Sequence, residues 1–364
     1  MERHAWLVTD DDEYDLLGIE KGSPKPWEDG LRTNGAKGTY EWWYFDSKLN
    51  DGSSLVVVFF TKPIASLDNN YVPYATFTLT KPDGSRIYSE TYQPIDSCSY
   101  SHNKCDVKIG ACSFKGDMHT YDIHWDYDGI IADIELRGNV PSWRPESGHI
   151  LFDFDNYFAW LPSVPEGDVE VTVTMGDSVE SYSGTGYHDH NWGNTPMFFL
   201  MHHWYWGRAK VGEYQVITSY ITANKKHSYD ETPIFMLARN GEIIADCPEK
   251  YLTYSELEPY YDVVTRKHVA GKLIYDYDDG NQHYRITYTR EGDIERMGME
   301  TQVTKLQYAA ILLMGLRGSY HRMVGTVTLE RIEGSEIVEK VTSHALWELM
   351  YFGKDRITKK SGRI

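Results

Sequence analysis

The dominant feature of the sequence is the alternation of polar and apolar residues over short segments that end in turn residues. Period-two or β-branched runs recur along the chain, for example at 54–60, 74–79, 168–174, 283–288 and 324–329. The turn residues between such runs are Asn50-Asp51-Gly52, Pro82-Asp83-Gly84, Asn240-Gly241 and Asp279-Gly280. Alternation places successive side chains on opposite faces of a strand, and turns of this chemistry close hairpins. The pattern predicts an all-β protein, a sandwich or barrel rather than a βαβ sheet.

Amphipathic helical periodicity is weak throughout. The best helical candidate is Thr304–Leu316, which fits a buried strand equally well. The chain has 364 residues, enough for two domains. Its character changes near residue 195, and the string Glu41-Trp42-Trp43-Tyr44-Phe45 is echoed by Glu348-Leu349-Met350-Tyr351-Phe352. We therefore expect two similar antiparallel β-barrels in tandem, residues 1–195 and 196–364.

The charge balance excludes two classes of partner. The formal net charge is −18 at pH 7 with histidine neutral, and a field of that sign repels phosphate backbones and anionic headgroups. The longest apolar runs, Leu55–Phe60 and Ala309–Leu316, fall far short of the ~20 residues that span a bilayer. We expect no nucleic-acid partner and no membrane span.

The cysteines and the N-terminus favour a cytoplasmic location. The four cysteines, Cys98, Cys105, Cys112 and Cys247, have no metal-type CxxC spacing. Reduced thiols are favoured, and a disulfide between two of them stays an alternative. The N-terminus lacks the basic and long apolar segments of a signal peptide. We expect a cytoplasmic protein, a monomer or a homodimer.

A first candidate cluster lies at residues 40–46. On a strand, Glu41, Trp43 and Phe45 share one face, and Trp42, Tyr44 and Asp46 share the other. A carboxylate beside indoles, if buried, has a raised pKa and becomes a usable acid. The alternative is that Glu41 is a structural acceptor bound to an arginine or to backbone N–H groups.

The most informative segment is Gly184-Thr185-Gly186-Tyr187-His188-Asp189-His190-Asn191-Trp192-Gly193. It concentrates histidine, acid, amide and indole side chains between glycines, which favours chemistry over a structural junction. Asp189 or a histidine can act as a Brønsted acid while Trp192 offers a π-face to a cation. Because His188 and His190 project the same way from an extended chain, a metal site with Glu41, His202 or His203 stays open as a second interpretation.

A third cluster, at residues 202–208, places Trp204, Trp206 and Arg208 on one strand face. Its guanidinium can stack on indole or pair with a carboxylate, either as structure or as a substrate contact. The remaining histidines stand alone and are interpreted as surface or core residues; His149 is one of them. Phosphate-binding glycine loops, GxSxG and HExxH are absent from the sequence, so nucleotide-dependent and elbow-serine chemistries have no support.

Three strings together carry a family resemblance: Glu41-Trp42-Trp43-Tyr44-Phe45, then Gly186-Tyr187-His188-Asp189-His190-Asn191-Trp192-Gly193, then Trp206-Gly207-Arg208. In order and spacing they resemble the carotenoid 1,2-hydratase (hydroxyneurosporene synthase) family. That family belongs to a lipocalin-like group that includes kievitone hydratase and fungal Diels–Alderases. His190 and Trp192 match its motif directly. Its downstream Tyr-x-Asp has Tyr220-Ile221-Thr222 as the nearest match here, without the acid.

The resemblance implies two lipocalin-like barrels with a cofactor-free site where they meet; no metal ligands are assigned, and metal binding by His188 and His190 stays open. It also implies a hydrophobic small-molecule substrate, isoprenoid-like or prenylated, whose alkene is protonated to a carbocation. The predicted catalytic residues are Asp189 or Glu41 as proton donor, with His188 and His190 orienting the acid or water. The predicted substrate-binding residues are Trp192, Tyr187, Trp43, Tyr44, Trp204, Trp206, Arg208 and Tyr220.

Three functions follow from this reading. The first is a hydratase, isomerase or cyclase that acts by proton transfer to an alkene. The second is a pericyclase that shapes a polyene for cycloaddition and needs no acid. The third is a lipocalin-type carrier of a hydrophobic ligand. The density of acid and histidine at 187–192 favours the first, because a carrier gains nothing from charges buried in its pocket.

Overall fold

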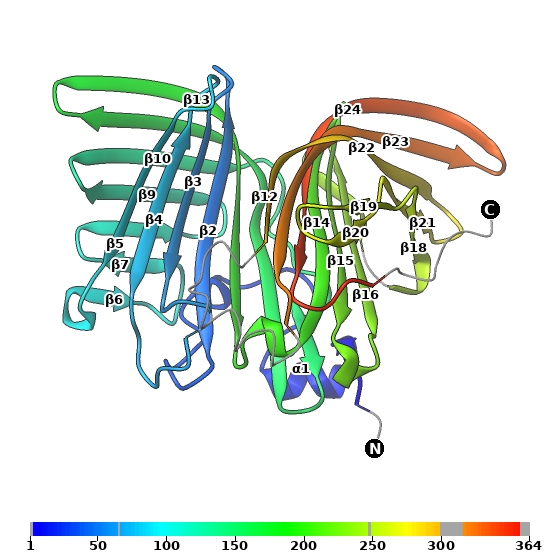
Figure 1. Cartoon of the computed structure of the whole chain (residues 1–364), viewed down its shortest axis with the longest axis horizontal. Coiled ribbons are helices and arrows are strands. Elements are labelled where there is room, and N and C mark those ends of the chain that lie inside the picture. The colour runs from blue at the N-terminus through cyan, green and yellow to red at the C-terminus, as the bar shows by residue number, and fades with distance from the viewer. Residues whose placement is uncertain (1–2, 65, 247–248, 299–315, 357–364) are drawn as a thin grey trace. The chain divides into compact units, whose positions relative to one another are not determined.

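The computed structural model describes residues 3–64, 66–246, 249–298 and 316–356, and it confirms the predicted all-β class (Figure 1). Strands account for 61% of the described residues and helices for 7%, in curled antiparallel sheets of lipocalin-like barrel type. The chain forms two compact units: residues 7–197, and residues 1–6 with 198–364. The division into domains at 1–195 and 196–364 stays a prediction. Cys247 and most of the ambiguous Thr304–Leu316 segment lie outside the described residues.

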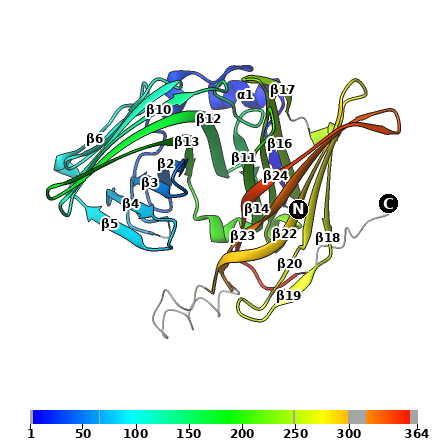
Figure 2. The ribbon, with the colours of Figure 1, turned by 90° about the horizontal axis from the view of Figure 1, so that it is seen from above.

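The unit of residues 7–197, here called the first unit, is one curled antiparallel sheet with short helical segments. Its strands run in the order β5-β4-β3-β2-β13-β12-β10-β9-β8-β7-β6, and β11 pairs with β12. Figure 2 shows this sheet bending round from β2 through β13 and β12 to β10. The elements are β1 (Ala5–Leu7), α1 (Asp11–Leu17), η1 (Pro26–Asp29), β2 (Tyr40–Leu49), β3 (Ser54–Phe60), β4 (Tyr74–Thr80), β5 (Arg86–Tyr92), η2 (Ile95–Ser97), β6 (Cys98–Tyr100), β7 (Asp106–Ile109), β8 (Cys112–Gly116), β9 (Thr120–Tyr127), β10 (Ile130–Gly138), β11 (His149–Phe152), β12 (Asn156–Met175) and β13 (Ser178–Gly193).

The second unit is built the same way. Its nine-stranded antiparallel sheet has the order β17-β16-β15-β14-β24-β23-β22-β21-β18, and β19 pairs with β20. The elements are η3 (Met197–Phe199), β14 (Met201–Val211), β15 (Tyr214–Ala223), η4 (Lys225–His227), β16 (Glu231–Arg239), β17 (Glu242–Asp246), η5 (Glu249–Tyr251), β18 (Leu252–Leu257), β19 (Tyr260–Asp262), β20 (Lys267–Val269), β21 (Lys272–Asp278), β22 (His283–Gly298), β23 (Ser319–Glu333) and β24 (Glu336–Tyr351). Across the described residues, no helix combines the length and apolar character needed to cross a membrane.

Period-two alternation sets the core of each unit. In β2 the odd-numbered Glu41, Trp43 and Phe45 are fully buried, whereas Trp42 and Tyr44 are part-exposed. The buried side chains of β2 join a continuous apolar cluster with those of β3, β4, β8, β9 and β12. The second unit has its own cluster, which is rich in tyrosine. The predicted division of faces at residues 41–46 is therefore confirmed.

Two features depart from the simple alternating strand pattern. One is a register shift at prolines in β12, and the other is a short helix near the N-terminus. The β12–β13 register shifts between Leu161, Val164 and Gly167, where Pro162 and Pro165 cannot donate ladder hydrogen bonds. The helix α1, which the sequence pattern missed, has acids in its first turn and ends at Gly18 in the left-handed conformation. At seven residues it is too short to show clear periodicity.

Close strand packing explains one glycine of the 184–193 segment. A Cβ built on Gly184 would lie 2.2 Å from the backbone oxygen of Lys48 on β2. We expect Gly184→Ala to lower the free energy of unfolding by about 2 kcal/mol, because a backbone atom cannot move aside as a flexible side chain can. The strand glycine Gly292 is the matched control, since its Cβ would meet Val324 at an ordinary 3.7 Å. Thermal unfolding of both alanine variants checks this, and equal midpoints would contradict it.

Candidate functional site

The site is centred on the pairing of β2 with β13 in the first unit. Antiparallel register places His188 opposite Phe45, Asp189 opposite Tyr44 and His190 opposite Trp43. The alternation of a strand then divides the 187–192 motif between two faces. His188, His190 and Trp192 share one face, and Tyr187, Asp189 and Asn191 share the other. This second half of β13 is buried on both faces.

On the inner face, His190 is held at both ring nitrogens. Its Nε2 lies 2.8 Å from Glu41 Oε1, and its Nδ1 lies 3.1 Å from the backbone oxygen of Glu28. Both partners offer acceptor oxygens, so a proton on either ring nitrogen has a hydrogen-bond partner. The ring stacks on Trp43, with centroids 4.6 Å apart, and Trp192 lies at the same centroid distance. His190 and Trp43 are fully buried.

Glu41 accepts hydrogen bonds at both carboxylate oxygens. Besides His190, Oε1 accepts the backbone N–H of Arg32 at 2.7 Å. Oε2 accepts the backbone N–H and the hydroxyl of Thr33 at 2.8 and 2.7 Å. The fully buried Glu41 carboxylate is therefore contacted by four donor groups, two of them backbone N–H groups. The structural alternative considered for Glu41 describes these contacts; its predicted role as proton donor stays a prediction.

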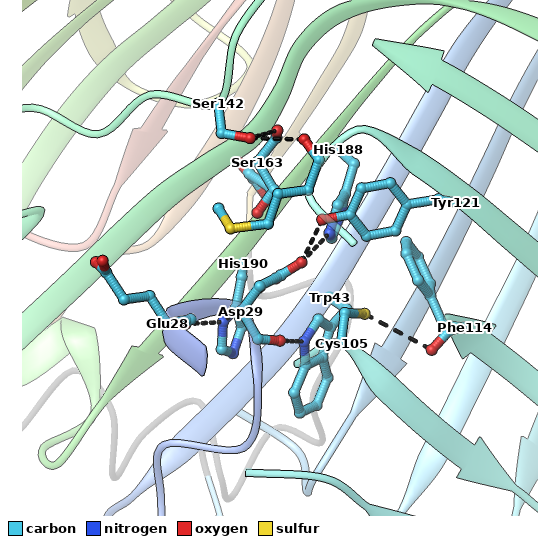
Figure 3. A network of polar contacts seen from close by, with 12 residues as sticks. Glu28, Asp29, Trp43, Cys105, Phe114, Tyr121, Ser142, Ser163, His188 and His190 are labelled. Atoms are coloured by element: carbon cyan, nitrogen blue, oxygen red, sulfur yellow. Dashed lines mark hydrogen bonds and ion pairs between the residues drawn. The ribbon is translucent and has the colours of Figure 1, made fainter. Parts of the chain in front are cut away.

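His188 is paired with a carboxylate that the motif analysis missed. Its Nδ1 lies 2.8 Å from the backbone oxygen of Tyr44, and its Nε2 lies 3.3 Å from Asp29 Oδ2. The same Asp29 oxygen accepts the hydroxyl of Tyr121 (Figure 3). All three side chains of this contact, Asp29, Tyr121 and His188, are fully buried.

Asp29, the carboxylate that pairs with His188, lies on the N-terminal strap, which is defined here as residues 20–33. Beside Asp29, Glu28 forms a buried ion pair with Arg144, whose Nε lies 3.3 Å from Glu28 Oε2. Arg144 also donates to the backbone oxygens of Gly22 and Glu20 at 3.0 and 2.6 Å. Burial raises the pKa of Glu28, and the Arg144 guanidinium opposes that shift. Arg144 thereby holds the beginning of the strap, at residues 20 and 22, and Glu28 against the barrel.

One group of side chains in this network has metal-ligand composition. Ligand atoms of Asp29, Cys105 and His188 lie within 4.8 Å of one another. Burial raises the pKa of the Cys105 thiol well above its usual value, which favours a protonated thiol in this network. The thiol donates to the backbone oxygen of Phe114 at 3.6 Å (Figure 3). These residues fit a hydrogen-bonded core better than a metal centre, and we assign no metal to them.

The opposite face of β13 carries Asp189, a buried carboxyl whose pKa is raised. Asp189 Oδ2 accepts the Tyr187 hydroxyl and the Trp160 indole N–H, each at 2.8 Å. Its Oδ1 accepts the Asn191 amide at 2.7 Å. Burial raises the pKa of Asp189 from 3.8 to about 6, against the opposing effect of these hydrogen bonds. A carboxyl in this range exchanges its proton near neutral pH, as a general acid requires.

The predicted aromatic residues fall into three settings. Trp43 and Tyr187 are fully buried, Trp192 is 5% exposed, and Tyr44 is part-exposed with its hydroxyl on Asp46 at 3.0 Å. His149, which the sequence reading treated as isolated, lies edge-on to Trp192 with centroids 5.4 Å apart. Burial lowers the pKa of His149 to about 4, so its ring is neutral at pH 7.

The remaining predicted residues belong to the second unit. Trp204, Trp206 and Arg208 share the part-exposed face of β14, as expected. Tyr220 is a core residue of β15 and stacks on Tyr254, with centroids 3.6 Å apart. His202 and His203, considered as metal ligands, contact each other through their Nδ1 atoms at 2.8 Å. Burial lowers the pKa of His202 to about 4.

Sequence reasoning missed Asp29, Tyr121, Trp160 and Asn191 as members of the site. Asn191 stands in the quoted motif two residues after Asp189, so strand periodicity alone identifies it as a neighbour. Trp160 follows once β12 is known to pair with β13, since it lies opposite Asn191. Asp29 and Tyr121 come from distant segments and carry no local signal.

Comparison with known proteins assigns the family. A model of the Diels-Alderase-like family matches residues 33–343, and the chain belongs to that family. The predicted recognition of a group uniting hydratases and Diels–Alderases is therefore confirmed.

Curated relatives match over part of their length. The quinolone epoxide rearrangement protein asqO of Emericella nidulans is 26% identical over 49% of this chain and 53% of its own. Hydroxyneurosporene dehydrogenase of Chlorobaculum tepidum is 27% identical over 48% and 54%. Diels-Alderase cheD of Chaetomium globosum is 33% identical over 56% and 51%. The chain spans about half the length of these relatives.

Solved structures show the same fold over nearly the whole chain. CghA has a TM-score of 0.61 at 14% identity, covering 93% of this chain and 98% of its own. Kievitone hydratase from Nectria haematococca has a TM-score of 0.52 at 14% identity, covering 96% and 98%. At this identity the likeness establishes the fold alone.

The raised pKa of Asp189 predicts a specific pH dependence of stability. Because the folded pKa, about 6, lies above the unfolded value of 3.8, the folded state disfavours the charged form. Stability from this group is full below pH ~4 and is lost as pH rises through ~6, by on the order of 3 kcal/mol. Asp189→Asn removes the titration, and its NH2 can face a rotated Asn191 amide. Chemical unfolding from pH 4 to 8 should show wild-type stability falling relative to this variant; parallel curves would contradict the assignment.

Glu41→Gln tests the inner network. The substitution replaces one acceptor oxygen with an NH2 group that faces donors, and it leaves His190 without its carboxylate. We expect a loss of about 3–5 kcal/mol in the free energy of unfolding, as for breaking a buried ion pair. Asp46→Asn on the part-exposed face of the same strand is the control and should cost less than about 1 kcal/mol. Urea unfolding compares the two, and equal losses would argue against a special role for Glu41.

Proposed function

We propose that this protein is a cofactor-independent hydratase, isomerase or cyclase that protonates an alkene of a hydrophobic isoprenoid-like or prenylated small molecule. The observation that carries the proposal is the buried Asp189 carboxyl, whose pKa of about 6 suits proton donation near neutral pH. The relatives named as a rearrangement protein and a Diels–Alderase support chemistry of the isomerase or cyclase type.

Asp189 is better suited than Glu41 to donate the proton. Glu41 accepts four hydrogen bonds and is fully buried in the inner network. Asp189 accepts three and lies on the face of the β2–β13 pair where Tyr44 and Trp42 are part-exposed. A substrate reaching this face meets aromatic walls and an acid, and water is scarce at a carboxyl that is 7% exposed.

The proposed first step is transfer of a proton from Asp189 to the alkene. The Asp189 O–H bond breaks, the alkene π pair forms a new C–H bond, and a tertiary carbocation remains beside an aspartate carboxylate. Indole and phenol faces stabilise such a cation without bonding to it. Capture by water then gives hydration, loss of a neighbouring proton to the carboxylate gives isomerisation, and attack by a second π bond gives cyclisation. In each outcome the proton released returns to Asp189 directly or through water.

The inner histidines have a positioning role in this proposal. His188 and His190 are fully buried and are bonded at both nitrogens to strap, strand and carboxylate groups. They hold β13 in register with β2 and thereby aim Asp189 to the other face. Their predicted direct part in orienting water is not needed for the proton transfer.

A pericyclase is the second candidate. It is favoured by the family match and by the 33% identity to Diels-Alderase cheD. A pericyclase folds a polyene into a reactive conformation, so its rate does not depend on a proton donor. The role of Asp189 therefore separates the two functions.

The test begins with native mass spectrometry of the full chain to identify a bound small molecule, followed by turnover of that molecule and of prenylated phenols in D2O. The proposal expects a solvent deuteron on carbon in the product and a 10²–10⁴-fold lower rate in Asp189→Asn, the usual contribution of a general acid. Asp46→Asn should keep the wild-type rate. Cyclisation that persists in Asp189→Asn without deuterium would instead identify a pericyclase, and binding without turnover a carrier.

A further inference from the structure

The two oxygens of Asp189 have unequal surroundings. Oδ2 accepts two hydrogen bonds, from the Tyr187 hydroxyl and the Trp160 indole, both at 2.8 Å. Oδ1 accepts one, from the Asn191 amide at 2.7 Å. A carboxylate oxygen has about two good acceptor positions. Within the described part of the chain, Oδ2 is therefore saturated while Oδ1 keeps a position at which a proton can sit.

Strand pairing builds this arrangement. Tyr187 and Asn191 lie two residues either side of Asp189 and so share its face of β13. Trp160 lies on β12 directly opposite Asn191. The three donors are 0%, 4% and 5% exposed, and Trp143 packs edge-on against Trp160 with centroids 6.0 Å apart. The donors are thus fixed by the sheet and by packing rather than by loop conformation.

All three donors to Asp189 are electrically neutral. This distinguishes Asp189 from Glu41 and Asp29, each of which contacts an imidazole. Neutral donors favour the ionised form without supplying a full countercharge. His188, whose ring lies on the other face of the same strand, also acts to lower the pKa of Asp189. On β2, the facing Tyr44 directs its hydroxyl to Asp46. Desolvation and hydrogen bonding therefore oppose each other at Asp189, and the balance is set by the number of donors.

We propose that Tyr187, Trp160 and Asn191 are positioning residues that set the acid strength of Asp189, and that Oδ1 is the oxygen that carries the transferable proton. Transfer of that proton to a substrate rests on the proposed function; the tuning of the carboxyl does not. As the Oδ1–H bond breaks, its electron pair stays on the carboxylate, and Tyr187 and Trp160 stabilise the charge through Oδ2 without moving. This assigns Tyr187 to the acid itself rather than to the substrate wall.

The direct test is titration of Asp189 by NMR in full-length protein labelled with 13C at the aspartate side-chain carboxyl. The signal is identified by its absence from Asp189→Asn. We expect Tyr187→Phe, Trp160→Phe and Asn191→Leu each to raise the pKa of Asp189 by about 0.5–1 unit, the effect of losing one neutral hydrogen bond to the charged form. Tyr44→Phe is the matched control, because it removes a neighbouring hydroxyl that is bonded to Asp46, and it should leave the titration unchanged.

Because three separate donor variants are measured, the test does not depend on one variant that fails to fold. Far-ultraviolet circular dichroism checks the fold of each variant. If the titration of Asp189 is the same in all folded donor variants as in the wild type, the tuning proposal is overturned. If Tyr44→Phe moves it as far as Tyr187→Phe does, specific hydrogen bonding is not the cause and the proposal also fails. Neutron diffraction at pH 5 should place the deuteron on Oδ1, and a deuteron on Oδ2 would overturn the choice of oxygen.

Kinetics separate this inference from the proposed function. With an identified substrate, the high-pH limb of the pH–rate profile should move upward in each donor variant by the same amount as the NMR titration. A purely structural role would lower the rate at every pH and leave the limb in place. If the titration moves but Asp189→Asn retains full turnover, the tuning stands and acid catalysis by Asp189 fails.

Discussion

Two buried imidazole–carboxylate contacts, His190 with Glu41 and His188 with Asp29, organise the first unit. Removing four ionisable groups from water is costly, and the cost is reduced as their polar atoms find partners. The partners come from β2, β13 and the strap, so these three segments must be assembled together for the core to be satisfied. The network therefore fixes the register of β2 against β13.

That register determines what the opposite face of β13 presents. With His188 and His190 turned inward, the intervening Asp189 must turn outward, because strand side chains alternate. A shift of one residue would exchange the rows, turning Asp189 toward Glu41 and both imidazoles toward the opposite face. The two faces of β13 thus have different roles. The histidine contacts on one face hold the strand in register, and Asp189 on the other face is the acid of the proposed chemistry.

The sequence predicted what depends on local periodicity. The all-β class, the two faces of residues 41–46 and the common direction of His188 and His190 follow from alternation alone. Asp29 and Tyr121 did not follow, because they reach His188 from segments about 160 and 70 residues away in the chain and no spacing rule connects them. The role of Glu41 was also left open, since nothing local indicates that the Arg32 and Thr33 backbone would supply its donors. Local patterns reveal which face a side chain occupies, and long-range pairing reveals its partner.

The energetics of Asp189 favour the chemical role proposed for its carboxyl over a structural one. A neutral asparagine at position 189 would keep the Tyr187 and Trp160 donors paired and, after rotation of one amide, would itself donate to Asn191. Glu41 differs, because it contacts an imidazole and accepts two backbone N–H groups. Desolvation that raises the pKa of Asp189 to about 6 is a standing cost to the fold at neutral pH. Such a cost is typical of a group whose protonation state is used, and strand alternation places this carboxyl on the face of β13 away from the two histidines.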